Sequence, residues 1–283
     1  MRTKAIADLA QLSEKQFLVT VASGLQQIAE NALILIEDAS RLELGKGRRG
    51  VPILTSVANE ESGKFLILID AVRCPREDSG RFVAQLRKFN DHLAKGIYAK
   101  SCYGMMGSFG AHRKWIEEER QEFYLDGPTG VDWIFKNEIL QRREQNFYVD
   151  YVSTDNGNNW WSPYDAERFE GSELLPARLP PSLQLVRAMA DAGFATPEAL
   201  AVIARKWRNI EMADDLQHWQ VQELNSDTLK TLEAEKLLLD HAQSGLSTIT
   251  ELWPFPLHSI DIGIVKVDQG ALRQVQDSWY PDQ

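Results

Sequence analysis

The sequence predicts a mainly α-helical protein, in which an antiparallel helical bundle is followed by a mostly helical C-terminal region. Apolar residues recur every three or four positions over most of the chain from residue 13 to residue 100, the period of an amphipathic helix. Turns rich in glycine and proline separate these stretches, and helices joined by short turns lie antiparallel. Strand-like alternation is confined to short segments. We expect the bundle over residues 1–165 and the C-terminal region, of unknown role, over residues 166–283.

The first long helix is expected from Ser13 to Leu42. Ser13 and Gln16 have the spacing of a capping box, in which each side chain bonds the other residue's backbone N–H. A heptad-like apolar stripe follows: Phe17, Val21, Leu25, Ile28, Ala32, Leu35, Ala39 and Leu42. Glycines then end the helix in a basic turn that contains Arg48 and Arg49. Two interpretations stay open: a solvated loop, or a contact with RNA phosphates.

A second helix is expected from Pro52 to Val72, since proline suits a first helical turn. Within this apolar segment Glu60, Glu61 and Lys64 form a polar group. Their spacings of three and four suit exposed ion pairs on one helix, with Gly63 allowing close helix packing. Alternatively, the group turns toward the third helix and supports its polar face. The spacing leaves both interpretations open.

A third helix, from Arg81 to Lys100, carries the candidate site. Its buried stripe is expected to be Phe82, Leu86, Phe89, Leu93 and Ile97. The opposite arc would hold Arg87, Lys88, His92 and Lys95, with Asp91 among them. This locally positive face lies on a chain with a formal net charge of −10, and it would attract an anion such as phosphate.

The rest of the chain is expected to contain shorter elements. A helix is predicted from Val131 to Gln145, and Phe147 to Tyr151 are extended in character. Further helices are predicted from Ser182 to Ala192, from Thr196 to Arg208, and from Asp227 to Gln243 with Asn225 or Ser226 as its cap. The alternation from Ile260 to Val267 predicts a short C-terminal strand.

Composition narrows the class of function. The acidic balance argues against nonspecific binding of nucleic acid over the whole surface, so any RNA contact must be local. Two cysteines are too few for a disulfide framework or a thiolate zinc site, and no cluster has the spacing of metal ligands, so we expect no metal and no cofactor. No signal-peptide pattern is present, and the most apolar runs are short, so we expect a cytoplasmic protein without a membrane span.

Three segments together resemble the AbiV-type abortive-infection family of the HEPN superfamily. They are Asn31-Ala32 with Glu37-Asp38-Ala39, then Ala58 to Lys64 with its Glu-Glu-x-Gly-Lys pattern, and Arg87 to Lys95 with its Arg-x4-His spacing. The segment from Phe147 to Tyr151, followed by Ser162-Pro163, also resembles that family's ending. The resemblance covers roughly residues 14 to 165 and implies a HEPN-type bundle that forms its cleft across a homodimer.

The resemblance implies a metal-independent endoribonuclease. Arg87 would hold phosphate oxygens through its planar donors, and His92 would transfer protons near its ordinary pKa. Lys88, Lys95, Glu60, Glu61, Lys64, Arg48 and Arg49 would bind RNA or support the pair. The pattern also departs from the family: Lys88 follows the arginine where Asn, Asp or His is usual, and Ala94 stands where a modifiable tyrosine occurs in some members.

Three classes of function remain for comparison. The first is the ribonuclease, which acts as an antiviral effector or a toxin on host or phage RNA. The second is a catalytically inactive HEPN module that binds a phage protein or a ribosome-associated partner and blocks translation. The third is a helical scaffold whose polar face is only solvated. Loss of toxicity in both Arg87→Ala and His92→Ala, with the fold intact, would separate the first class from the second.

Overall fold

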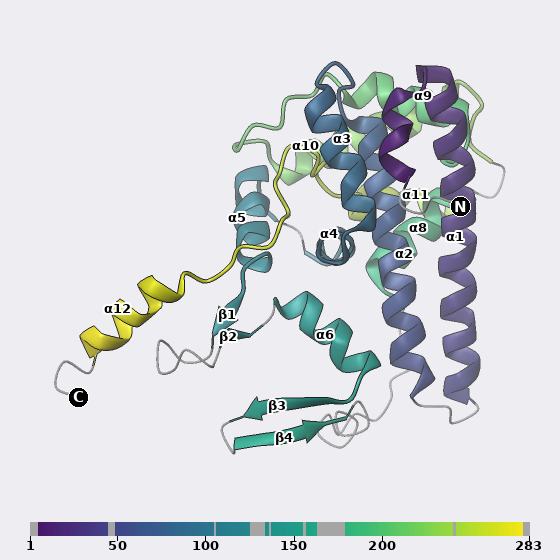
Figure 1. Ribbon diagram of the computed structural model, residues 1–283. Coiled ribbons are helices and arrows are strands. Elements are labelled where there is room, and N and C mark those ends of the chain that lie inside the picture. Colours follow the sequence, from purple (N-terminus) through teal and green to yellow (C-terminus); the bar gives the residue numbers. More distant parts are fainter. Residues whose placement is uncertain are drawn as a thin grey trace.

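The computed structural model describes residues 5–44, 49–104, 106–124, 134–135, 137–154, 157–162, 179–239 and 242–279, and it confirms the mainly α-helical class (Figure 1). The helical elements are η1 (Ala5–Gln11), α1 (Glu14–Leu44), α2 (Gly50–Arg73), α3 (Ser79–Arg87), η2 (Lys88–Asn90), α4 (His92–Lys100), α5 (Phe109–Glu119), α6 (Glu138–Phe147), α8 (Pro181–Asp191), α9 (Pro197–Trp207), α10 (His218–Ala234), η4 (Ala242–Gly245), α11 (Leu246–Leu252) and α12 (Gln269–Trp279). Two antiparallel hairpins accompany them: β1 (Phe123–Tyr124) with β2 (Ile134–Phe135), and β3 (Asp150–Thr154) with β4 (Gly157–Trp161).

Helices α1 and α2 form the long antiparallel pair (Figure 1), and α3, α4, α6, α8 and α9 pack on one or both of them. The expected capping box at the start of α1 is present, because the Gln16 N–H donates to Ser13 Oγ at 3.4 Å and the Ser13 N–H donates to Gln16 Oε1 at 3.3 Å. The inward stripe of α1 is buried at Phe17, Val21 and Leu25. The sequence therefore predicted this helix and the first half of its buried face correctly, but the expected burial of Leu42 is wrong: Leu42 is 39% exposed, and Ile36 is buried in the second half instead.

The expected single helix from Arg81 to Lys100 is wrong. The chain forms α3, a turn of 3-10 helix, and then α4, with Asp91 in an extended conformation between them (φ −92°, ψ 124°). The Asp91 carboxylate accepts the Ala94 N–H at 3.0 Å, so this residue caps a new helix instead of continuing the old one. Leu86 and Leu93 on either side of the break are still buried, because both helices pack on α2.

The C-terminal region agrees with expectation in α8 and α9, where the Thr196 side chain accepts the Ala199 N–H at 3.3 Å. The expected start of the next helix is wrong, since α10 begins at His218. Asn225 is no cap: it is buried inside α10 and donates to Thr250 O at 3.2 Å and to Trp253 O at 3.0 Å.

The expected strand over Ile260–Val267 is also wrong. Its pairing is limited to one parallel bridge between Gln121 and Val265. The Val265 N–H donates to Arg120 O, and the Glu122 N–H donates to Val265 O, both at 2.9 Å. This segment therefore follows the end of α5 as irregular chain, without the continuous partner strand that a ladder requires.

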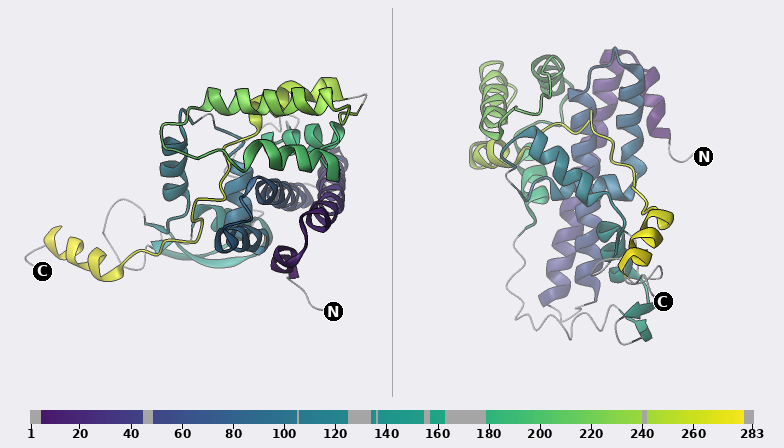
Figure 2. Two further views of the ribbon diagram at one scale, coloured as in Figure 1. Left: turned by 90° about the horizontal axis from the view of Figure 1, so that it is seen from above. Right: turned by 90° about the vertical axis from the view of Figure 1, so that its left-hand side faces the viewer.

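One hydrophobic core joins the N-terminal bundle to the C-terminal helices. Helices α8 and α9 pack against both α1 and α2, as the two further views also show (Figure 2). The expected domain boundary between residues 165 and 166 lies outside the described residues. The two regions nevertheless share their buried side chains, so their stabilities are coupled.

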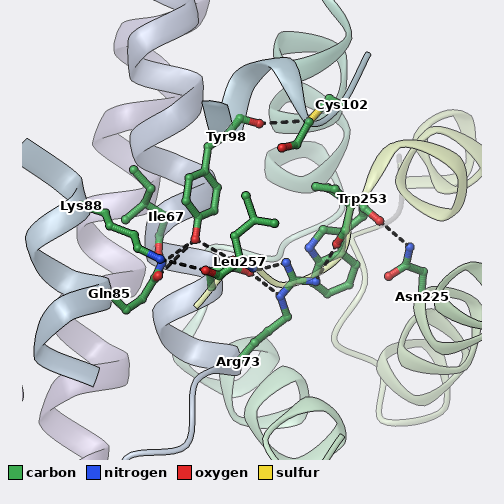
Figure 3. Close-up of polar contacts among 12 residues, drawn as sticks. Ile67, Arg73, Gln85, Lys88, Tyr98, Cys102, Asn225, Trp253 and Leu257 are labelled. Carbon is green, nitrogen blue, oxygen red and sulfur yellow. Dashed lines mark hydrogen bonds and ion pairs between the residues drawn. The ribbon is translucent and has the colours of Figure 1, made fainter. Parts of the chain in front are cut away.

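A buried polar network strengthens this junction (Figure 3). Asp70 accepts from Arg73 Nε at 2.7 Å, from the Tyr98 hydroxyl at 2.8 Å and from the Leu257 N–H at 2.6 Å. The Arg73 guanidinium also lies 4.8 Å from the ring centroid of Trp207, a cation–π contact. Full burial of these charges requires such complete pairing. The network therefore ties α2 and α4 to the chain near Leu257.

Helix α1 has a further property. Among the described helices, it is the one long and apolar enough to cross a membrane by length and composition alone. Its apolar side chains Phe17, Val21 and Leu25 are fully buried against the rest of the protein. The core accounts for only part of its apolar composition, because 33% of its apolar window is buried and Val19 and Ile34 are about half exposed.

Candidate functional site

A groove of about 540 Å³ lies between α2, α4 and α6. Its walls include Glu60 from α2, His92 and Lys100 from α4, and Arg142 and Arg143 from α6. Three helices that are distant in sequence thus place one histidine, two carboxylates (Glu60 and Glu138) and three cations around one hollow. The His92 side chain is 44% exposed, so solvent and a ligand can reach it.

The Glu60 carboxylate is the centre of this cluster. Its two oxygens lie 2.9 and 3.0 Å from Nδ1 of His92. It also accepts from Lys95 Nζ at 2.9 Å and from Arg143 Nε at 2.7 Å. One carboxylate therefore fixes a histidine and two cations from two other helices.

The helix geometry explains why these groups meet. His92 and Lys95 are three residues apart on α4 and hence lie on the same face of that helix. Gly63 lets α2 approach this face closely, because a Cβ at that position would collide with the Lys95 backbone carbonyl. The close approach brings Glu60, almost one turn earlier on α2, within hydrogen-bonding distance of α4.

Electrostatics keep Glu60 ionised. Burial raises its pKa, but the hydrogen bond and charge of Lys95, together with His92, outweigh burial and bring the pKa below its ordinary value of 4.5. The carboxylate is thus negative at neutral pH.

Both interpretations of the Glu60/Glu61/Lys64 group apply, each to different members. Glu60 turns toward α4, as the second interpretation expected. Glu61 instead pairs with Lys64 on the same helix, at the three-residue spacing of the first, but the expected exposure is wrong: their side chains are only 12% and 24% exposed. Lys64 Nζ also lies 5.6 Å from the centroid of the Phe89 ring. Only Glu60 of these three is part of the groove wall.

Arg87 lies apart from His92. It is exposed at the end of α3 and lines a different groove of about 400 Å³, with Arg81, Asp91 and His258 among its walls. The break at Asp91 explains the separation, because Arg87 and His92 belong to two helices and not to one face. Within a single chain, the structure therefore does not bring Arg87 into the groove of Glu60 and His92.

The expectation that Lys88 and Lys95 face solvent is wrong. Lys95 is only 4% exposed, and its Nζ bonds Glu60. Lys88 Nζ donates to Leu257 O at 2.8 Å and to Ile260 O at 2.9 Å, and burial lowers its pKa to about 8. Both ammonium groups are bound within the protein because buried charges require partners.

Of the two arginines in the basic turn, the structure describes only Arg49. Arg48 lies outside the described residues. Arg49 is exposed immediately before α2, with backbone angles of the right-handed helical region. Its side chain is on the surface, as either interpretation of the turn would have it.

Sequence reasoning missed Arg143. It lies 83 positions after Glu60, on α6. The helix expected from Val131 to Gln145 begins only at Glu138, because Ile134–Phe135 form β2, and it had been given no role. Its neighbour Arg142 is paired with Glu138 on the same helix at 2.6 Å. The pairing of Glu60 with Arg143 depends on how α6 packs over α2 and α4, a tertiary arrangement that local spacing does not encode.

This arrangement suits proton transfer. Among the described residues, the hydrogen-bond partners of His92 are all at Nδ1, and Nε2 has none. When Nδ1–H donates to Glu60, Nε2 carries the lone pair of a base. Over the same part of the chain, no group of three or more His, Cys, Asp or Glu side chains is placed to hold a metal ion.

Comparisons with protein-family models, with curated proteins and with solved structures found no match to this chain.

Proposed function

We propose that this protein is a metal-independent endoribonuclease of the HEPN type, acting as an abortive-infection effector or a toxin in the cytoplasm. The main support is the pairing of a solvent-accessible His92 with the carboxylate of Glu60 in a groove that also contains arginines. The resemblance of residues 14–165 to the AbiV-type family is consistent with this function. Since the chain is acidic overall, RNA would contact the groove locally.

In the proposed reaction, Nε2 of His92 accepts the proton of a ribose 2′-hydroxyl, and the 2′-oxygen attacks the adjacent phosphorus. The bond to the 5′-oxygen breaks, and that oxygen takes a proton as it leaves. The products are a 2′,3′-cyclic phosphate and a 5′-hydroxyl. Glu60 acts as a positioning residue, because it fixes the orientation of the imidazole through Nδ1.

Arginine supplies the charge stabilisation that the pentacoordinate transition state requires. Arg142 and Arg143 line the His92 groove and are the arginines proposed for this role. Arg87 faces another groove, so its role requires a second copy of the chain. A symmetric homodimer would bring two sets of these groups together and supply a second histidine to protonate the leaving oxygen.

The binding-module alternative has its own support. Arg87 and His92 line different grooves, and Lys88 and Lys95 are bound inside the protein. A module with this surface would act by occupying a phage or ribosomal protein, without cleaving RNA. Light scattering offers a first test, since a monomer at micromolar concentration, with or without RNA, contradicts the dimeric ribonuclease.

The decisive test of the reaction class is incubation of the purified protein with total RNA in EDTA, followed by mapping of the cut ends. The proposed function predicts cleavage with 2′,3′-cyclic phosphate or 3′-phosphate ends. Magnesium-dependent cleavage with 3′-hydroxyl ends contradicts the proposed mechanism. Toxicity in cells without any RNA cleavage favours the binding module.

A further inference from the structure

Exposed aromatic side chains gather directly after α6, on and beside the β3–β4 hairpin. Tyr148 and Val149 are exposed in the lead-in to β3, Tyr151 is 61% exposed on β3, and Trp160 is 71% exposed on β4. We call Tyr148, Tyr151 and Trp160 the aromatic cluster; Val149 lies among them. Single exposed apolar residues are ordinary on protein surfaces. Four large ones within one short segment indicate a contact surface.

The two central rings face each other across the hairpin. Tyr151 pairs with Trp160 in the strand register, and their ring centroids are 5.2 Å apart with an interplanar angle of 57°. Such a cross-strand pair stabilises a hairpin. Stabilising the hairpin uses only the ring surface that Tyr151 and Trp160 bury against each other. The large exposed fraction of both rings leaves further aromatic surface available to a ligand.

Cations lie between this cluster and the groove. Arg142 and Arg143 belong to α6, whose last residue, Phe147, immediately precedes the cluster. The Arg143 guanidinium lies 5.2 Å from the centroid of the Phe147 ring, so charge and aromatic surface are already in contact there. At about 3.3 Å per extended residue, Tyr151 is at most about 13 Å along the chain from Phe147. Helix α6, which carries both arginines, leads directly into β3 (Figure 1).

Aromatic rings beside basic side chains are the combination that binds single-stranded nucleic acid, because bases stack on the rings while cations contact the phosphates. We propose that Tyr151 and Trp160 form a stacking platform for unpaired bases of single-stranded RNA, whose backbone continues past Arg142 into the His92 groove. This inference rests on the proposed function and names its substrate class. Duplex RNA fits poorly, since its bases are already stacked on each other.

The test measures binding separately from cleavage, in a His92→Ala background. Fluorescence anisotropy would report the affinity for a fluorescein-labelled oligouridine of about a dozen nucleotides and for a blunt RNA duplex. Trp160→Ala should weaken binding of the single strand by roughly 5- to 150-fold, the range for one lost base–aromatic stack. Trp160→Leu keeps an apolar side chain in the hairpin and should weaken it similarly, whereas Trp160→Phe should retain most of the affinity.

Trp219→Ala is the matched control. Trp219 is 57% exposed on α10, which lies far from β3 and β4 (Figure 1), and its removal should leave the affinity unchanged. Equal affinities of Trp160→Ala, Trp160→Leu and Trp219→Ala would overturn the inference, as would equally tight binding of the duplex. If Trp160→Ala instead turns a dimer into a monomer without changing RNA affinity, the cluster is a self-association surface and the inference fails.

These outcomes are independent of the cleavage chemistry. If the affinity for single-stranded RNA depends on Trp160 but His92→Ala cleaves RNA at the parent rate, the stacking platform is supported and the proposed active site is wrong. If His92→Ala abolishes cleavage while the Trp160 variants bind normally, the active site stands and the stacking platform fails.

Discussion

Removing the negative charge of Glu60 should destabilise the fold, because Lys95 would lose its carboxylate partner. Lys95 is 4% exposed, while the Glu60 side chain is 18% exposed. Breaking a fully buried pair by removing one partner costs about 3–5 kcal/mol. Partial access of water to Glu60 reduces this, so Glu60→Gln should lower the free energy of unfolding by about 2–3 kcal/mol. For a chain of this size, that corresponds to a fall in Tm of about 4–10 °C.

A second substitution isolates the cause. Lys95→Met alone leaves Glu60 with His92 and Arg143, and should cost only about 1 kcal/mol. The double variant Glu60→Gln/Lys95→Met removes the unpaired ammonium, so it should be more stable than the sum of the single effects by about 1–2 kcal/mol. Urea denaturation of the four proteins gives the coupling directly. A Glu60→Gln variant within about 0.5 kcal/mol of the parent, or strictly additive effects, would refute this reasoning.

The pH dependence gives an independent check. Because folding lowers the pKa of Glu60, its carboxylate stabilises the fold at neutral pH. This contribution is lost as the pH falls below the ordinary value of 4.5 and through the folded pKa. The stability difference between the parent and Glu60→Gln should therefore narrow in acid. A difference that stays constant from pH 7 to strongly acidic pH would show that the charge is not responsible.

Other substitutions test the packing and the buried network by urea denaturation. Gly63→Ala should destabilise the fold, because its Cβ would collide with the backbone of α4, and this cost should exceed the roughly 1 kcal/mol gained from the higher helix propensity of alanine. Gly24→Ala, whose Cβ would make only ordinary contacts, should be neutral or stabilising. Equal effects at the two sites would contradict this packing. Asp70→Asn should cost about 3–5 kcal/mol by leaving Arg73 buried without a carboxylate, and a cost under about 1 kcal/mol would contradict that pairing. Folding lowers the pKa of Lys88 from 10.5 to about 8, so between these pH values the unfolded chain binds more protons than the folded one, and the free energy of unfolding should rise with pH. Lys88→Met should lack this rise. The same dependence of unfolding free energy on pH in Lys88→Met and in the parent would contradict the burial of Lys88.

Local patterns were enough to predict the elements that local chemistry determines. The capping box at Ser13 and the cap at Thr196 depend on residues three positions apart, and both are present. The break at Asp91 escaped prediction because the apolar stripe from Leu86 to Leu93 stays in phase across it, with both helices packed on α2. A carboxylate that competes for backbone N–H groups was the available signal for that break.

The candidate site was predictable only in part. His92 and Glu60 were identified from spacing and resemblance, and they do meet. The partners of the cations lie in distant segments: Lys88 donates to carbonyls 169 and 172 positions away, and Arg143 donates to Glu60, 83 positions earlier. Such contacts depend on how the elements pack, and a helical period within one segment does not specify them.

The central claim is that His92, held by Glu60, transfers the proton in RNA cleavage. Its most direct test is the single-turnover cleavage rate of His92→Ala in EDTA, compared with the parent and with Arg41→Ala, a control at an exposed arginine of α1. The account predicts a loss of at least roughly 10²- to 10⁴-fold for His92→Ala, with retained helical content and Tm, and no change for Arg41→Ala. A His92→Ala protein that cleaves RNA at the parent rate would contradict the account.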